Sequence, residues 1–345
     1  MTNPVVVEVT RGAFVESRHR GAIAVVDTKG RVRAAVGEIS EPIFPRSSVK
    51  AIQALPLVES GAADRYGFGH AELALCCASH NGEPRHVETV RGMLARAGRG
   101  EADLECGVQM PFAHDAANAL IRADTPPNQL HHTCSGKHSG FVCLACAMGA
   151  DPRGYVEPDH PVQREVTAAL ESLTGVRLDD SNRAIDGCSI PTYAIPLEKL
   201  AHAFARYGTG DGLTPERARA ARRLRDACFA EPFMVAGTGA FDTQALELFA
   251  GRLFVKFGAE GVFCAALPEL GLGVALKCTD GEKRASEVML AAVVDAFLAP
   301  DDPGREGFAG RFAPPVLTRR KVAVGTVRPV AGLVESLRQG QHLTA

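Results

Sequence analysis

A serine and a lysine three residues apart, Ser47 and Lys50, have the types and spacing that suit covalent catalysis. Pro42 and Pro45 hold the approach extended, because the residue before a proline is pushed out of the helical region. After Pro45 apolar residues recur at helical spacing, which predicts a helix that begins there. Ser47 then lies in the first turn with Lys50 on the same face, so a nucleophile lies beside a base in the positive field of a helix N-terminus.

The lysine of this pair is a rare residue in the chain. Of 38 lysines and arginines only 8 are lysines. Lysine can lose its proton when it is buried, whereas arginine effectively cannot, so a lysine inside such a motif favours chemistry. Ser-x-x-Lys is the nucleophile motif of β-lactamases and penicillin-binding proteins, although the spacing alone is a weak signal. A surface lysine on an ordinary helix is the alternative.

Composition excludes several classes of protein. The chain has 345 residues, of which 46% are hydrophobic and 23% are charged, which is typical of a globular protein with a large core. A formal net charge of -2 without a basic block argues against nucleic acid as a partner. We find neither a signal-peptide pattern nor an apolar run of membrane-spanning length, and we expect a soluble cytoplasmic protein with no membrane partner.

Cysteine usage also agrees with a cytoplasmic protein. In a large chain that we expect to be intracellular, free thiols or metal ligands are favoured over disulfides. Most of the cysteines lie among apolar residues and are interpreted as small core residues. Cys134 and Cys188 differ, because they lie among glycine, serine and charged residues. The ten cysteines are Cys76, Cys77, Cys106, Cys134, Cys143, Cys146, Cys188, Cys228, Cys264 and Cys278.

The elements that must position these residues can be predicted from periodicity. We expect one mixed α/β domain over residues 1–345, in which a sheet joins strands from both ends of the chain and the middle, about 45–230, is mainly helical. The polar cluster Glu16–Gly21 is interpreted as a solvated turn between two strands. Strands are predicted at 4–10, 22–36 around a turn at Asp27–Gly30, 253–264, 271–278 and 321–327, and helices at 70–77, 86–97, 141–148, 161–173, 193–207, 215–229 and 286–298.

Three further segments are dense in polar residues and suit loops of a catalytic site. Ala78–Glu83 carries Ser79 and His80 directly after a predicted helix, and His131–Gly140 precedes another. A third loop carries Asp186 and Cys188. His80, His131 and His132 are left out of the predicted site, because loop histidines are more often solvated or structural.

Together these segments resemble the Rhizobium etli-type L-asparaginases, a family unrelated to the two better-known asparaginase types. The resemblance extends over nearly the whole chain and rests on several motifs in the same order. These are Glu16–Gly21, Pro45–Lys50, Ala78–Glu83, Cys134–Gly140 and Asp186–Cys188.

The resemblance implies a fold similar to serine β-lactamases, penicillin-binding proteins and glutaminases, with a mainly antiparallel sheet and helices, and a homodimer. It implies two serine–lysine tandems, Ser47 with Lys50 and Ser79 with Lys256. Lys256 is the weakest assignment, since it rests on the short match Lys256–Gly258 between strands.

The same resemblance implies a zinc ion bound by Cys134, Lys137 and Cys188. Asp186 and His138 match residues close to that metal, and Arg46 matches an active-site arginine. Lysine is an unusual ligand because it must be neutral to coordinate, so two free thiols beside a structural lysine remain the alternative.

The residue types of the predicted site also suit amide hydrolysis. Amide hydrolysis through an acyl-enzyme needs a nucleophile, a base and oxyanion donors. Ser47 is the candidate nucleophile, and its backbone N–H is a candidate oxyanion donor. Lys50 can act as base if burial and a second cation, Lys256, lower its pKa from about 10.4 to roughly 7–8. Ser79 is assigned as a proton relay, with exchange of the two serine roles left open.

The predicted activity is hydrolysis of L-asparagine, a small-molecule substrate, to aspartate and ammonia. Arg46 is expected to bind the substrate carboxylate bidentately. Zinc is expected to position the substrate or fix the loops, and not to activate the attacking water. A glutaminase, a β-lactamase or D,D-peptidase, and a non-enzymatic zinc-binding regulatory protein are the alternatives. One methylene separates asparagine from glutamine, about 1–3 kcal/mol, which sequence does not resolve.

Overall fold

The computed structural model describes residues 3–343 and divides them into two compact units. One unit comprises the N-terminal residues up to Ser48, residues 194–209 and the chain from Leu248 onward. The other comprises 49–193 and 210–247. The single domain expected from the sequence stays a prediction. The mixed α/β class with a mainly antiparallel sheet is confirmed.

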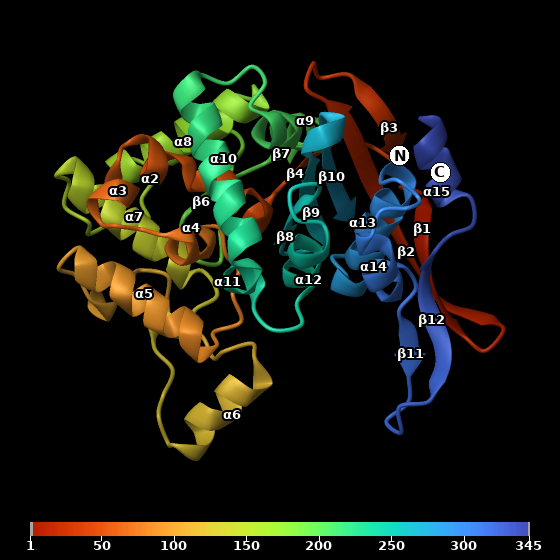
Figure 1. Cartoon of the computed structure of the whole chain (residues 1–345), viewed down its shortest axis with the longest axis horizontal. Coiled ribbons are helices and arrows are strands. Elements are labelled where there is room, and N and C mark those ends of the chain that lie inside the picture. Colours follow the sequence, from red (N-terminus) through yellow and green to blue (C-terminus); the bar gives the residue numbers. More distant parts are fainter. Residues whose placement is uncertain (1–2, 344–345) are drawn as a thin grey trace. The chain divides into compact units, whose positions relative to one another are not determined.

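The first unit is built on a nine-stranded sheet (Figure 1). Its main path runs β11-β12-β1-β2-β10-β9-β8, while β3 pairs with β2 and with β13. All pairs are antiparallel except β3 with β13. The strands are β1 (Val5–Arg11), β2 (Phe14–Asp27), β3 (Val32–Val36), β8 (Phe254–Gly258), β9 (Val262–Leu267), β10 (Leu272–Cys278), β11 (Pro315–Leu317), β12 (Ala323–Pro329) and β13 (His342–Leu343).

β2 is the longest strand and changes character along its length. Its C-terminal half, Ala22–Asp27, is buried throughout and pairs with β10, as a strand covered on both faces should. Its N-terminal half pairs with β1 and contains Glu16–Gly21. The prediction of a solvated turn at Glu16–Gly21 is therefore wrong, because pairing with β1 extends the strand through these polar residues.

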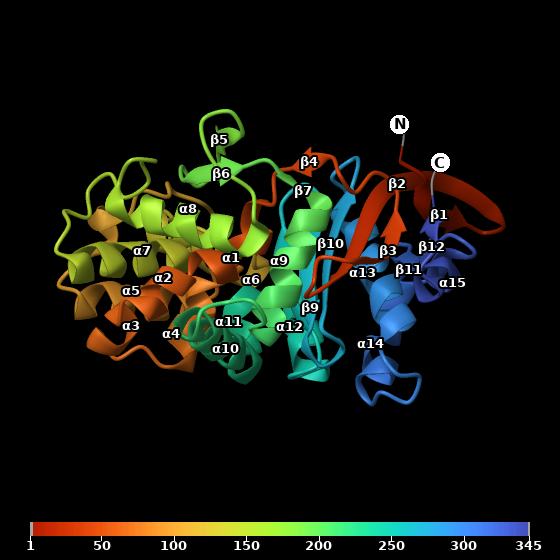
Figure 2. The ribbon, with the colours of Figure 1, turned by 90° about the horizontal axis from the view of Figure 1, so that it is seen from above.

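Two helices cover opposite faces of this sheet (Figure 2). α9 (Leu197–Thr209) packs on β10, β2 and β9, and α13 (Lys283–Phe297) packs on β10, β12, β1 and β9. Gly273 of β10 faces α9, and a Cβ atom there would lie 2.0 Å from the Ala201 carbonyl oxygen. α14 (Gly304–Phe312) and α15 (Leu333–Gln339) pack on α13.

A hairpin lies where the sequence predicted one strand over 253–264. β8 and β9 are joined by a tight turn at Glu260 and Gly261, both with positive φ. β8 ends at Gly258, whose backbone lies against Pro45 and Ser48, because a Cβ at Gly258 would lie 2.6 Å from the Pro45 carbonyl oxygen. A small pair, β4 (Pro42–Ile43) with β7 (Ile195–Pro196), completes the unit.

The second unit is helical and surrounds α7 (Ser135–Met148). This helix is buried on all sides from Ser135 to Ala145, and it packs against α2, α3, α4, α5 and α8. Its glycines permit that approach, since a Cβ on Gly136 would lie 2.4 Å from the Leu75 carbonyl oxygen.

The other helices of the second unit include several short ones, and a small β-hairpin completes the unit. They are α1 (Lys50–Gln53), α2 (Leu55–Glu59), α3 (Ala62–Arg65), α4 (His70–Cys76), α5 (Pro84–Arg96), α6 (His114–Arg122), α8 (Pro161–Thr174), α10 (Pro215–Ala230), α11 (Pro232–Ala236) and α12 (Phe241–Leu248), with the pair β5 (Arg183–Ile185) and β6 (Pro191–Tyr193). Within residues 3–343, none of the helices combines the length and the apolar character that crossing a bilayer requires.

We predict that Gly273→Ala strongly destabilises the protein. The added methyl group would meet backbone atoms of α9, which cannot rotate away, so the loss should reach or exceed about 3 kcal/mol. Gly92→Ala on α5 is the matched control, because nothing lies within 4 Å of its Cβ position, and it should gain about 0.5–1 kcal/mol from helix propensity. Unfolding in guanidinium chloride measures both. Equal midpoints for Gly273→Ala and wild type would contradict the close packing of α9 on β10.

Candidate active site

The segment that carries Ser47 is a short 3-10 helix, Arg46–Val49, and not the start of a long α-helix. It is followed by two short helices, α1 and α2. Arg46 has φ +52°, a left-handed conformation that is strained for a non-glycine residue and is often found at functional sites.

Two adjacent serines in this segment have different surroundings. Ser48 is fully buried. Its Oγ donates to the Pro45 carbonyl (2.8 Å) and accepts from the Cys264 thiol (3.3 Å). Ser47 is half-buried. Of the two, Ser47 is therefore the serine that a substrate can approach.

Lys50, the first residue of α1, is completely buried. Its Nζ donates to the Ala78 carbonyl oxygen (2.6 Å), to Ser79 Oγ (3.0 Å) and to Cys134 Sγ (3.1 Å). An ammonium group away from water needs partners of this kind, because an isolated buried charge costs many kcal/mol. The structure thus joins three predicted site residues, and it adds a contact between Lys50 and Ser79 that sequence analysis did not name.

Cys134 and Cys188 form a pair of sulfur atoms between two lysines. Cys134 contacts Lys50, and Cys188 Sγ accepts from Lys137 Nζ at 3.1 Å. A hydrogen bond from Cys188, helped by the charges of Lys50 and Lys137, holds the pKa of Cys134 well below its ordinary value against the effect of burial. The same hydrogen bond, together with burial, raises the pKa of Cys188.

Lys137 lies in the first turn of α7 and is buried. Burial favours loss of its proton, but the sulfur atoms of Cys188 and Cys134 and the carboxylate of Asp186 outweigh burial and raise the pKa of Lys137. Asp186 lies in the tight loop between β5 and β6, where its backbone bonds to Ser189 and Ile190 hold Cys188 in place. Two sulfur atoms and one amine within hydrogen-bonding distance form a donor set that fits zinc.

His138 is buried beside this cluster. Its Nδ1 bonds to the hydroxyl of Tyr155 at 2.6 Å, and that hydroxyl accepts from the Glu105 backbone N–H. The Tyr155 hydroxyl thus links the His138 ring to the backbone of Glu105. Burial, and next the charge of Lys137, lower the pKa of His138 well below its ordinary value, so the ring is neutral.

The loop that carries Ser79 is held by hydrogen bonds of its neighbours. The Ser79 N–H donates to the Val235 carbonyl. His80 Nδ1 accepts from the Gly82 N–H, so Nε2 carries the proton and donates to Ser135 Oγ at 3.0 Å. Ser135 Oγ in turn donates to the Leu130 carbonyl. Burial lowers the pKa of His80 well below its ordinary value, and this neutral histidine positions the loop.

Lys256 belongs to the first unit and is also completely buried, on β8. Its Nζ donates to the Phe257 carbonyl at 2.9 Å. Across the hairpin it pairs with Cys264, whose thiol donates to Ser48 Oγ, so Lys256 lies close to the Pro45–Ser48 segment within this unit. The tandem of Lys256 with Ser79 stays a prediction.

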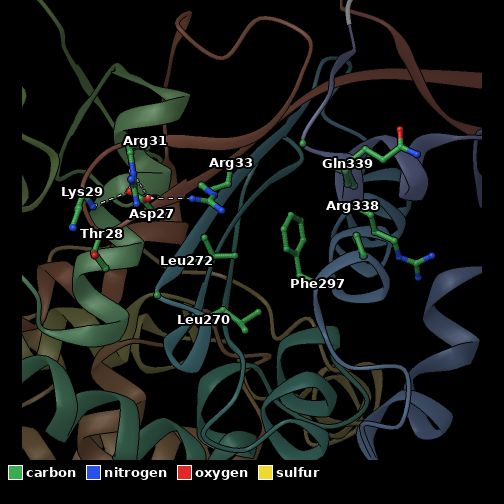
Figure 3. A pocket seen from close by; sticks show the side chains of 14 residues that line it. Asp27, Thr28, Lys29, Arg31, Arg33, Leu270, Leu272, Phe297, Arg338 and Gln339 are labelled. Atoms are coloured by element: carbon green, nitrogen blue, oxygen red, sulfur yellow. Dashed lines mark hydrogen bonds and ion pairs between the residues drawn. The ribbon is translucent and has the colours of Figure 1, made fainter.

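Two pockets lie within the individual units. A pocket of about 570 Å³ in the second unit is lined by Asn81, Glu83 and residues 112–116, and so lies beside the Ser79 loop. A pocket of about 640 Å³ lies in the first unit and is basic (Figure 3). In this pocket Arg31 and Arg33 form ion pairs with Asp27, and its carboxylate neutralises part of their charge.

In the second unit the buried Lys50 thus contacts Ser79 and Cys134. The chain belongs to the L-asparaginase II family, whose sequence model matches residues 7–329. The resemblance to Rhizobium etli-type L-asparaginases is thereby confirmed. No curated protein matches the chain.

Several solved structures are similar to this chain at low identity. One is a protein named Mglu, at 15% sequence identity, with 81% of this chain and 67% of that chain covered and a TM-score of 0.35. A β-lactamase from Mycobacterium bovis has 16% identity, covers 76% of this chain and 88% of its own, and has a TM-score of 0.36. Simvastatin synthase from Aspergillus terreus has 12% identity, covers 75% of this chain and 86% of its own, and has a TM-score of 0.35.

We predict that Ser135→Ala destabilises the protein by about 1–3 kcal/mol. It removes the acceptor of the buried His80 N–H and the donor to Leu130, and buried polar groups left without partners cost this much. Ser139→Ala is the control, because Ser139 is equally buried on the same helix but bonds only to the Ser135 carbonyl of that helix. Thermal unfolding should show a clear loss for the first variant and a change below about 1 kcal/mol for the second. Equal losses would contradict the role of Ser135 in holding the loop.

Proposed function

We propose that the protein hydrolyses L-asparagine to L-aspartate and ammonia through a serine acyl-enzyme. Family membership supports an asparaginase. The observation that carries the mechanism is the buried Lys50 Nζ, 3.0 Å from Ser79 Oγ and three residues after Ser47 in the chain.

In the proposed reaction Ser47 Oγ attacks the side-chain amide carbon of asparagine. Lys50 in its neutral form takes the hydroxyl proton, and Ser79 passes a proton from Lys50 to the leaving nitrogen. The C–N bond breaks and ammonia leaves, which leaves an aspartyl ester on Ser47. Water then attacks the ester carbon, one of its protons returns to Ser47 Oγ, and aspartate is released.

Further residues are proposed to bind and stabilise the substrate. Arg46 would bind the α-carboxylate, and the backbone N–H of Ser47 would donate to the oxyanion. Lys256 would act as the second cation that keeps Lys50 neutral. Asp186 and His138 would contact the substrate near the sulfur cluster. The Nε2 atom of His138 supports this role, because among the described residues it is buried without a hydrogen-bond partner.

Zinc is part of the same proposal, bound by Cys134, Lys137 and Cys188. When bound, the ion would supply a fixed positive charge that orients substrate and loops. Binding would displace the proton of Lys137, because only a neutral amine coordinates. A cytoplasmic location and a homodimer complete the proposal, supported by ten free cysteines and by the resemblance to the family.

We predict that Ser47→Ala abolishes ammonia release from L-asparagine, with kcat reduced at least ~10³-fold, while Ser79→Ala reduces it ~10²–10³-fold. Ser48→Ala is the matched control and should retain activity, since Ser48 bonds only within its own unit. Ammonia release from L-asparagine, L-glutamine and buffer is measured side by side. Full activity of Ser47→Ala would contradict the role of Ser47 as nucleophile. Inactivity of the wild type on both amides would favour a β-lactamase or D,D-peptidase, which acylation by labelled penicillin detects.

We predict that Cys188→Ser lowers the zinc content of the purified protein by one equivalent. It removes a sulfur that lies 3.1 Å from Lys137 Nζ. Cys143→Ser is the control, because Cys143 is equally buried and a serine there can still donate to the Met93 carbonyl. Elemental analysis after dialysis decides the question. Equal zinc content in Cys188→Ser and wild type would remove Cys188 from the ligand set.

A further inference from the structure

A second group of metal-ligand side chains lies in the sheet unit, at the end of β10. β10 ends at Cys278, which pairs with Gly21 of β2. His19 lies two residues before Gly21 and so shares the face of the sheet that carries Cys278. The chain then turns back, with Thr279 N–H donating to the Arg20 carbonyl, and this turn brings Asp280 over the same face.

The three side chains are in direct contact. Asp280 accepts from His19 Nδ1 at 2.7 Å through one carboxylate oxygen and from the Cys278 thiol at 3.0 Å through the other. The ligand atoms all lie within 4.8 Å of one another. His19 and Cys278 are buried, and the Asp280 side chain is 48% exposed, so an ion could enter from the side of the carboxylate.

We propose that His19, Cys278 and Asp280 bind a divalent ion of the zinc class. This site goes beyond the proposed function and does not depend on it. Thiolate and imidazole together select zinc or cobalt over calcium and magnesium, which prefer oxygen ligands. Three protein ligands leave a fourth, tetrahedral position for water.

The geometry is close to what an ion requires. In a tetrahedral zinc site neighbouring ligand atoms are separated by about 3.4–3.6 Å. The observed separations of 2.7 and 3.0 Å need to widen by about 0.4–0.9 Å, since here protons bridge the ligand atoms instead of an ion. Two of the ligands lie on paired strands and are fixed, and the exposed Asp280 turn can supply the movement.

The charges at the site also favour a cation. The Asp280 side chain offers both carboxylate oxygens at the site, one to His19 and the other to Cys278. Within residues 3–343 its recorded ion pair is with His19. The neighbouring Lys277 directs its ammonium to the carbonyls of Glu260 and Cys278 and not to this carboxylate.

Titration with Co²⁺ in the Cys188→Ser background tests the site, because this background removes a sulfur ligand from the other proposed metal site. We expect a thiolate-to-cobalt absorption band that zinc displaces, that Cys278→Ser abolishes and that Cys143→Ser leaves unchanged. Asp280→Asn keeps the thiol and changes an exposed side chain, and it should weaken Co²⁺ binding by at least ~10-fold.

Two results would overturn the proposal. One is the absence of a cobalt band that depends on Cys278, and the other is wild-type affinity in Asp280→Asn. If Cys278→Ser does not fold, the zinc content of Asp280→Asn in the otherwise wild-type chain tests the site instead. We expect elemental analysis to show the loss of one bound zinc ion. Asparaginase activity does not enter this test, so its outcome is separate from that of the proposed function.

Discussion

One buried lysine amine holds the candidate active site together. Lys50 Nζ is shielded from water and makes contacts with Ala78, Ser79 and Cys134, which come from two different segments of the chain. Removing a polar group from water is costly unless it finds hydrogen-bond partners. The Ser79 loop and the start of α7 therefore have to meet at this amine, and a structure that separates them would leave the buried amine without these partners.

Each of two buried lysines in the second unit contacts a sulfur atom. Lys50 Nζ donates to Cys134 Sγ, and Lys137 Nζ donates to Cys188 Sγ. The neutral, buried His80 and His138 add no charge to the cluster and act through directed hydrogen bonds. In the proposed amidohydrolase these side chains would supply the base, the relay and the metal-binding donor set.

Sequence analysis identified the family of the chain, but it did not predict the contact between Lys50 and Ser79. The types and order of Ser47, Lys50, Ser79, Cys134 and Cys188 were sufficient to identify the family, which the match over residues 7–329 confirms. The bond between Lys50 and Ser79 could not be predicted, because its partners lie 29 residues apart and meet only through packing around α7. Such a long-range contact leaves no periodic signal in the sequence.

Local patterns failed where tertiary packing overrides them. Glu16–Gly21 is polar enough to suggest a turn, yet pairing with β1 makes it a strand. The segment Ser135–Gly140 is polar and glycine-rich, yet it forms the first turns of α7, because those glycines allow close approach to α4 and its polar side chains find buried partners. The predicted strand over 253–264 is a hairpin because Gly261 permits the tight turn.

The most direct test of this account is the asparaginase activity of Lys50→Met, a variant that keeps the length of the side chain and removes its amine. If Lys50 is the base that serves Ser47 and Ser79, kcat for L-asparagine should fall by roughly 10²–10⁴-fold while near-UV circular dichroism shows an intact fold. A folded Lys50→Met variant with wild-type kcat would contradict the central role of this amine.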